Sequence, residues 1–390
     1  MNTYRKYNTY GRLRTVLLGT YFYPEFFSKI KNPKVREPMM RIAQEINEDL
    51  DYFHQVLQNF GCQVLRADQP AGYFDEENPY LPPLQTRNTH AVVGDRLYQI
   101  NEDFYNALDP IYRAYCPDIT NIVAANNSFF KRSTNAAIQS YNPQKDIWYS
   151  KLKYQEMAGS SWPNYLDYVA GFRSADPNIA KELEEHRSVL EYETKEFLPL
   201  QGPNIVNTDH TIYVDANEYC DYSNWLRKHI IDPRPIRQFN TKAAHCDGCF
   251  AVLGNNVILG IDPLIDYKKY FPGYTIIGLN ADQYSVPIKD YKVMKTKVAG
   301  KWWLAGEEHN DEFIGFVESK LKNWLGYISE SVFDVNVLAL DENTVCTLNV
   351  SPEIEKQLRS SGIECILVPW RHRFFVDCGL HCLTLDLYRD

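Results

Sequence analysis

The chain has 390 residues, of which 44% are hydrophobic and 14% aromatic, and its formal net charge at pH 7 is −9. A globular chain of this length can bury a large core, as one big domain or two ordinary ones. The negative charge argues against nucleic acid or an anionic membrane as the main partner, because both attract basic surfaces. We therefore expect a small-molecule substrate.

The beginning of the sequence is polar and has no apolar segment behind it that would mark a secretory signal. No stretch approaches the roughly 18 apolar residues that are needed to span a bilayer. The nine cysteines are scattered between Cys62 and Cys382 without a compact framework, which is typical of a reducing compartment. We expect a soluble, cytoplasmic protein.

In chain order, the pattern predicts a first strand over residues 14–19, a long helix over 35–60 that ends at Gly61, and a return strand over 62–65. Hairpins of two apolar strands and a short polar turn follow. A helical pattern comes after each hairpin, and another strand closes the unit. The hairpins cover 91–98, 205–214, 251–259 and 337–346; the helices cover 104–113, 217–231, 263–270 and 352–361; closing strands cover 274–277 and 364–368.

The recurring unit is therefore strand, strand, helix, strand. Such units cannot bury both faces of a small sheet alone, so they stack around an axis, and loops at one end of the axis meet. A closed ring of about five units would make residues 1–390 a single domain and bring Cys382 back beside the N-terminal strand. Residues 126–200 are less regular, and we interpret them as a partly helical insertion, with a helix over 180–197, that could serve as a lid.

The end of the chain places a thiol at the mouth of a strand. Residues 383–387 alternate apolar and polar, which predicts a half-buried strand, and Gly379 ahead of them allows a close backbone approach. Cys382 could thus face a pocket, although a free cysteine more often packs as a small core residue. By alternation, His381 would lie on the opposite face of the strand and be structural.

A second polar pair, His245 and Asp247, stands at the entrance of the strand over 250–253. Residues two apart in a strand point to the same side, so both can face one pocket as a base and a polar partner. A zinc site is an alternative reading, with ligands drawn from His245, Cys246, Cys249, Cys378, His381 and Cys382. Strand entrances with apolar flanks seldom present four ligands tetrahedrally, so we expect no metal and no other cofactor.

Four motifs together resemble the guanidino-group-modifying enzymes, and within them the amidinotransferases of the glycine and inosamine-phosphate type. The resemblance extends over the order and spacing of the units, except at residues 126–200. It implies an α/β fold of the pentein type, a five-bladed αβ propeller built from pseudo-fivefold ββαβ units with the active site at the axis. The motifs are Leu-Arg-Thr-Val-Leu-Leu-Gly at 13–19, Arg87 to Asp95, His-x-Asp-Gly-x-Phe at 245–250, and Gly-Leu-His-Cys-Leu-Thr at 379–384.

The resemblance implies catalytic roles for Cys382 and His245. Cys382 would attack the guanidino carbon of an arginine-like donor, and His245 would carry protons to the leaving amine and from the incoming amine. Asp247 would bind the guanidinium through charge-assisted hydrogen bonds. The implied partners are a small guanidino donor and an amine acceptor, and the sequence also allows a homodimer.

Three positions that are usually acidic in the family carry amides in this chain. The family's Arg-Asp pair appears as Arg87-Asn88, and two further acids appear as Gln201 and Asn204. Each lost ionic hydrogen bond would weaken the binding of a guanidinium by about 1 to 3 kcal/mol. Gln201 could orient His245 but could not stabilise its imidazolium by charge. We still expect these four residues to line the substrate site.

The substitutions leave three readings. Amidino transfer is the principal prediction. A guanidine hydrolase of the deiminase or dihydrolase type, using the same Cys382 and His245, is the first alternative, and a propeller that retains only binding is the second. The family's arginine for the substrate carboxylate is also not evident, and Arg371 or Arg373 could replace it.

Overall fold

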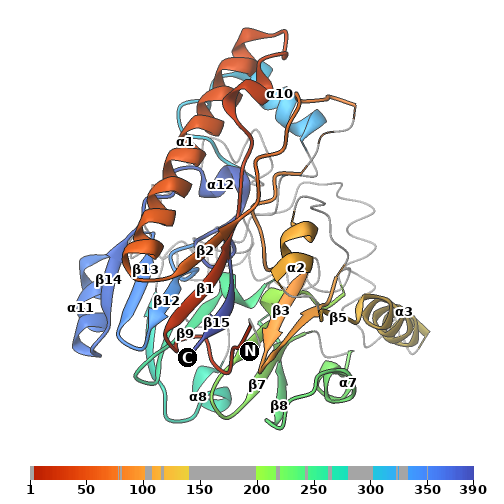
Figure 1. The fold of residues 1–390 in the computed structure, drawn as a ribbon, viewed down its shortest axis with the longest axis vertical. Coiled ribbons are helices and arrows are strands. Elements are labelled where there is room, and N and C mark those ends of the chain that lie inside the picture. The colour runs from red at the N-terminus through yellow and green to blue at the C-terminus, as the bar shows by residue number, and fades with distance from the viewer. Residues whose placement is uncertain are drawn as a thin grey trace, which may run out of the picture.

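The computed structural model describes residues 4–77, 79, 81–101, 108–115, 118–139, 199–216, 220–241, 245–261, 266–279, 302–321, 324, 333–348 and 350–390. In this part of the chain the fold is α/β, with five separate three-stranded sheets. The sheets lie next to one another, and the longest helix runs along the outside of the molecule (Figure 1). The small sheets agree with the α/β fold expected from the sequence.

The first sheet joins the two ends of the chain. Strand β1 (Leu13–Leu18) lies between the antiparallel β15 (Thr384–Arg389) and the parallel β2 (Gln63–Arg66), which follows helix α1 (Pro33–Asn59). Figure 1 shows the two ends of the drawn chain next to each other below this sheet. The last strand, which follows the turn with Cys382, is therefore fixed against the first strand.

The other four sheets repeat the same plan, in which an antiparallel hairpin is followed by a helix and a third strand parallel to the second. The predicted unit of strand, strand, helix and strand is thus confirmed. The units are β3 (His90–Val93), β4 (Arg96–Gln99), α2 (Asp109–Tyr115) and β5 (Thr120–Asn121); β6 (Ile205–Asn207), β7 (Ile212–Asp215), α7 (Tyr222–His229) and β8 (Ile236–Phe239); β9 (Phe250–Leu253), β10 (Val257–Ile261), α8 (Tyr267–Tyr270) and β11 (Thr275–Leu279); and β12 (Leu338–Asp341), β13 (Thr344–Thr347), α11 (Pro352–Ser360) and β14 (Glu364–Leu367).

Helix α1 forms where the sequence predicts it, and local signals fix both of its ends. Asn32 caps the first turn by accepting a hydrogen bond from the backbone N of Lys34, and Pro33 occupies the first helical position. Gly61, with φ of 96°, follows the helix in the left-handed region. One face of the helix packs into the largest core cluster through residues three or four apart: Met39, Ile42, Ala43, Ile46, Leu50, Phe53 and Leu57.

Neighbouring sheets contact one another in chain order, and the last contacts the first. β15 contacts β3, and β1 contacts β12. Asn207 Nδ2 donates a 3.1 Å hydrogen bond to Val92 O, which joins β6 to β3. The rings of Phe239 and Phe250, on β8 and β9, lie 5.6 Å apart, and α11 contacts β11. Each sheet in this part of the chain therefore contacts the sheet before it and the sheet after it.

The elements outside the five units are short, except for the helices α3 (Val123–Gln139) and α10 (Asp311–Lys320). The irregular segment predicted over 126–200 begins as part of a helix, α3 (Val123–Gln139), and its predicted helix over 180–197 lies outside the described residues. No helix in the described ranges combines the length and apolar character that crossing a bilayer requires. The other elements are η1 (Pro24–Phe27), η2 (Gly202–Asn204), η3 (Cys246–Gly248), α10 (Asp311–Lys320) and α12 (Arg373–Val376).

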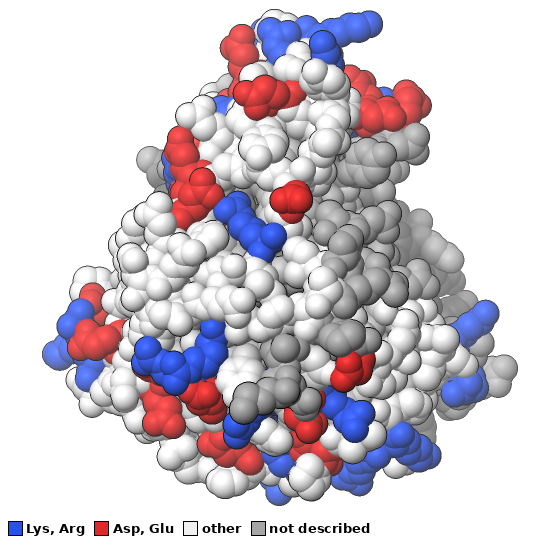
Figure 2. All heavy atoms as spheres, viewed as in Figure 1, with Lys and Arg blue, Asp and Glu red and all other residues white. Residues whose placement is uncertain are grey.

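The charges on the visible surface are mixed rather than segregated. On the face drawn in Figure 2, acidic and basic side chains alternate along the edges, and the centre of the face is mostly uncharged. The described residues on this face therefore do not form the continuous basic stripe that a nucleic-acid-binding surface requires.

Candidate active site

Cys382 lies in the turn that leads into β15, and only 3% of the residue is exposed. The strand begins at Thr384, so His381 and Cys382 both belong to the turn and do not alternate across a sheet. The prediction that His381 points away from the site is therefore wrong. Its Nδ1 lies 2.7 Å from Oδ2 of Asp247, on the same side as the thiol.

His245 immediately precedes the short helix η3 at the entrance of β9, Asp247 lies within that helix, and both residues are buried. Asp247 Oδ2 lies 3.6 Å from the Sγ of Cys382, although 135 positions separate the two residues. The segment that carries His245 therefore lies against the turn that carries the thiol. His245 is held by a 2.6 Å hydrogen bond between its Nε2 and the Oε1 of Gln201.

Gln201 and Asn204 form one compact corner around η2. The backbone N of Gln201 donates to Asn204 Oδ1 over 3.1 Å, so the Asn204 side chain holds its own loop. Gly202 is required at this corner, because a Cβ there would lie 2.0 Å from Arg87 O and 2.2 Å from His90 O. The tight contact fixes the loop of Gln201, and with it His245, against the start of β3.

Arg87 and Asn88 approach the site with their side chains engaged by the protein. Arg87 Nε donates to His381 O over 2.6 Å, and its Nη2 lies 3.1 Å from Asp386 Oδ1. Asn88 Nδ2 donates to Gln85 Oε1 over 2.5 Å. The predicted substrate-binding roles of Arg87 and Asn88 stay predictions, and Arg87 contacts the turn that carries Cys382.

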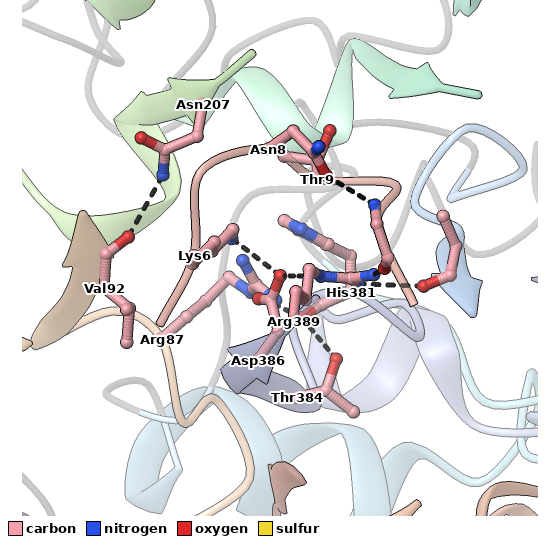
Figure 3. A network of polar contacts seen from close by, with 12 residues as sticks. Lys6, Asn8, Thr9, Arg87, Val92, Asn207, His381, Thr384, Asp386 and Arg389 are labelled. Carbon is pink, nitrogen blue, oxygen red and sulfur yellow. Dashed lines mark hydrogen bonds and ion pairs between the residues drawn. The ribbon is translucent and has the colours of Figure 1, made fainter. Parts of the chain in front are cut away.

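A buried cluster of charged side chains, centred on Asp386, is connected through Arg87 to the turn that carries Cys382. Asp386 accepts from Lys6 Nζ at 2.8 Å and from Arg389 Nε at 2.7 Å, in addition to Arg87, and Figure 3 shows the three cationic side chains converging on it. Burial alone would raise the pKa of Asp386, but the three cations hold it well below its usual range. Burial lowers the pKa of Lys6 to about 8, and Asp386 limits this change.

The pair of Asp247 and His381 sets the charge beside the thiol. Burial, together with the positive charge of Arg87, lowers the pKa of His381 to about 4, so the ring is neutral at pH 7. Burial alone would raise the pKa of Asp247, but the hydrogen bond from His381 and nearby positive charges lower it. Asp247 is therefore a carboxylate that accepts a hydrogen bond from the neutral imidazole. Its second oxygen, Oδ1, has no hydrogen-bond partner within the part of the chain that the structure describes.

Asp247 and His381 also border a small cavity of about 30 Å³. This space is sufficient for roughly two water molecules. Lys6 and Thr9 lie at its border as well, and the rest of its wall is formed by Pro203 and by the apolar residues Ile205, Val206, Phe250, Ala251, Val252, Leu253, Val335, Val337 and Ala339.

Two alternatives from the sequence concern a zinc site and an arginine that would bind the substrate carboxylate. Among the described residues, no three His, Cys, Asp or Glu side chains are arranged to hold a metal ion. Cys246 Sγ donates instead to Pro203 O over 3.0 Å. Arg371 is bound to Asp49 and Glu48 of α1, so its guanidinium is not directed at a substrate.

One residue at the thiol was not found from the sequence. Asn336 is fully buried just before β12, and its Nδ2 lies 3.1 Å from the Sγ of Cys382. The only signal for it is an isolated amide between two valines, Val335 and Val337, in an otherwise apolar run. Such a pattern does not show which distant residue the amide contacts.

Comparison with known proteins supports the fold expected from the motifs. The sequence matches no protein-family model and no curated protein sequence. The structure is similar to SxtG, an amidinotransferase of the saxitoxin biosynthetic pathway from Microseira wollei, with 15% identity, a TM-score of 0.56 and coverage of 99% of this chain and 97% of that one. It is also similar to the inosamine-phosphate amidinotransferase StrB1 from Streptomyces griseus, with 12% identity, a TM-score of 0.57 and coverage of 100% and 97%.

The chain shares its fold with these amidinotransferases. The resemblance noted from the motifs is thereby confirmed at the level of the fold.

Proposed function

We propose that this protein moves an amidino group from an arginine-like donor to an amine acceptor through a covalent amidino-cysteine on Cys382. The observation that carries the proposal is the position of Asp247, a buried carboxylate 3.6 Å from the thiol with one oxygen unpartnered among the described residues. A buried carboxylate with a vacant acceptor site is suited to a cationic group with several N–H donors, such as a guanidinium.

We further propose that the five sheets are the blades of a closed propeller with this site at its axis. The antiparallel pairing of β1 with β15 unites the two ends of the chain in one blade. The contacts between successive sheets, and between the first and last, support a ring rather than an open row. In a ring, the loops that carry Cys382, His245 and Gln201 all belong to one end of the axis.

The reaction would proceed in two balanced steps. The thiolate of Cys382 forms a bond to the guanidino carbon, the bond from that carbon to the donor amine breaks, and the amine leaves with a proton from His245. The acceptor amine then bonds to the same carbon and returns a proton to His245, and the sulfur leaves as the thiolate. No oxidant, reductant or metal is needed for either step.

Gln201 would determine how His245 takes part in proton transfer. Because an amide oxygen can only accept, Nε2 of His245 carries the hydrogen in the observed bond, and Nδ1 is the nitrogen that exchanges protons with the amines. A neutral amide stabilises the imidazolium less than a carboxylate would. Asp247 would bind the guanidinium, with Asn88 and Arg87 beside it, while Asn204 would act by holding the loop of Gln201.

The decisive experiment is intact-mass measurement after incubation with arginine and no acceptor. The wild-type protein should gain the mass of one amidino group and release one equivalent of ornithine, whereas Cys382→Ala should gain nothing. Cys378→Ala, which removes another buried thiol four positions earlier, is the matched control and should behave as the wild type. If the wild type, like Cys382→Ala, gained no mass and released no ornithine, the amidino-transfer proposal would be refuted.

The small cavity beside Asp247 and His381 favours hydrolysis as the second candidate, because it could hold the attacking water. A hydrolase would turn arginine into citrulline-like product and ammonia without an acceptor, and the adduct would not accumulate. Adding a primary amine distinguishes the two reactions, since only a transferase makes a new guanidino compound at the expense of the adduct.

A further inference from the structure

The side chain of Asn336 occupies a central position at the nucleophile. Its Nδ2 donates to Cys382 Sγ over 3.1 Å and to Asp247 O over 3.0 Å. Its Oδ1 accepts from the backbone N of His381 over 2.9 Å and of Cys382 over 3.1 Å. An asparagine side chain has two N–H donors and two acceptor positions, so these four bonds use all of them.

These partners also fix which way the amide faces. The two backbone N–H groups of His381 and Cys382 can only donate, so they must meet the oxygen of Asn336. The nitrogen is then directed at the sulfur and at Asp247 O. The orientation follows from the chemistry of the neighbours, and rotating the amide by half a turn would set donors against donors.

An N–H donor favours the charged form of a sulfur, because a thiolate accepts a hydrogen bond better than a thiol does. Two other features around Cys382 act in the opposite direction. The residue is buried, and the Asp247 carboxylate lies 3.6 Å away, so both desolvation and like charge disfavour the thiolate. Asn336 supplies a compensating contact directly at the sulfur.

Gly379 provides an independent sign that the turn is built around Asn336. A Cβ on Gly379 would lie 2.6 Å from both Cβ and Oδ1 of Asn336, which real structures do not tolerate. The backbone N of Leu380 also donates to Asn336 O over 3.1 Å. The glycine that the sequence places ahead of the thiol therefore makes room for this one side chain.

We propose that Asn336 is a positioning residue that aims the sulfur of Cys382 and stabilises its thiolate. The inference rests on the proposed function only in taking Cys382 as the nucleophile, and it concerns the reactivity of the sulfur before any substrate binds. It assigns a role to a residue that neither the motifs nor the predicted catalytic pair includes.

The test is the rate at which iodoacetamide alkylates Cys382 between about pH 5 and about pH 10, followed by peptide mass spectrometry. At pH 7 the wild-type Cys382 should react faster than Cys365, whose pKa burial raises to about 11. Asn336→Leu removes the donor while keeping the same number and branching of side-chain heavy atoms, and Asn336→Asp keeps the oxygen for the two backbone N–H groups. In both variants the midpoint should move up by about one pH unit or more, with an about tenfold slower reaction at pH 7.

The matched control is Asn207→Leu, which removes another buried asparagine that donates to a backbone oxygen, Val92 O. It should leave the profile of Cys382 unchanged. The proposal is overturned if either folded Asn336 variant, checked by circular dichroism, keeps the wild-type midpoint. It is also overturned if wild-type Cys382 reacts no faster than Cys365, a result that needs no variant to fold.

The outcome can be separated from that of the proposed function. If Asn336 governs the thiol profile but arginine yields no adduct, the amidino-transfer proposal fails and the role of Asn336 stands. If the adduct forms while the Asn336 variants keep the wild-type midpoint, the reverse holds.

Discussion

Replacing Asp386 by asparagine tests how strongly the buried charge cluster holds the two ends of the chain together. Asp386 is fully buried, and it is the carboxylate that Lys6, Arg87 and Arg389 share. Asp386→Asn keeps the shape but removes the negative charge, so three buried cations lose their counter-ion. Breaking a buried pair in this way costs about 3 to 5 kcal/mol.

Urea denaturation at pH 7 measures the effect. With an m-value of about 3 kcal/mol/M for a chain of this size, the unfolding midpoint should fall by about 1 to 1.7 M. Asp390→Asn is the matched control, because this acid is half-exposed and pairs with the similarly exposed Arg14. An exposed pair is worth about 0 to 1 kcal/mol, so the control should lose little stability.

The pH dependence of the stability lost in Asp386→Asn gives a second check. In the wild type the pKa of Lys6 is lowered from its ordinary value to about 8, so the unfolded state binds more protons above that pH and stability rises with pH. Without Asp386 the pKa of Lys6 falls further, and the side chain becomes neutral at a lower pH. The gap between variant and wild type should therefore narrow from about pH 7 to about pH 9. A loss as small as that of Asp390→Asn, or a gap that does not change with pH, would refute this reasoning.

Three further predictions concern the same region. Burial lowers the pKa of His381 to about 4 from an ordinary 6.5, so the free energy of unfolding should be unaffected by this group above about pH 6.5 and should decrease by about 2 to 4 kcal/mol as the pH falls to about 4. Thermal melts at several pH values should show that the melting temperature of His381→Asn depends less on pH than that of the wild type. Equal slopes for the two proteins would contradict this prediction. Gly202→Ala should destabilise the protein by about 1 to 3 kcal/mol, because the new methyl group would meet two backbone oxygens. Gly315→Ala, whose methyl group would meet nothing within 4 Å in helix α10, should stabilise the protein by about 0.5 to 1 kcal/mol. Urea midpoints of the two variants that move in the same direction would be inconsistent with these contacts. Arg87→Met should lower the free energy of unfolding by about 3 to 5 kcal/mol, because Asp386 loses one cation and His381 O loses its hydrogen-bond donor. A urea midpoint equal to that of the wild type would show that these contacts do not stabilise the fold.

The sequence by itself was sufficient for the repeating unit. Hydrophobic alternation, short polar turns and helix ends such as Gly61 are local signals, because backbone geometry and burial act over a few residues. They located the four hairpins, the long helix α1, the closing strands β2, β11 and β14, and the strand after Cys382, but not the closing strands β5 and β8. The motifs also singled out His245, Asp247 and Cys382, and the structure brings Asp247 and Cys382 together.

The tertiary structure alone decided what each polar side chain touches. Alternation placed His381 on the wrong face, because the strand starts only at Thr384 and His381 lies in the turn before it. Arg87 contacts Asp386 and the turn that carries Cys382, and Asn204 holds its own loop.

Asn336 lies 46 positions from Cys382, and no periodicity within one segment can report a hydrogen bond between two sheets. Local patterns determine which element a residue belongs to. Only the packing of separate elements determines which partner satisfies a buried polar group.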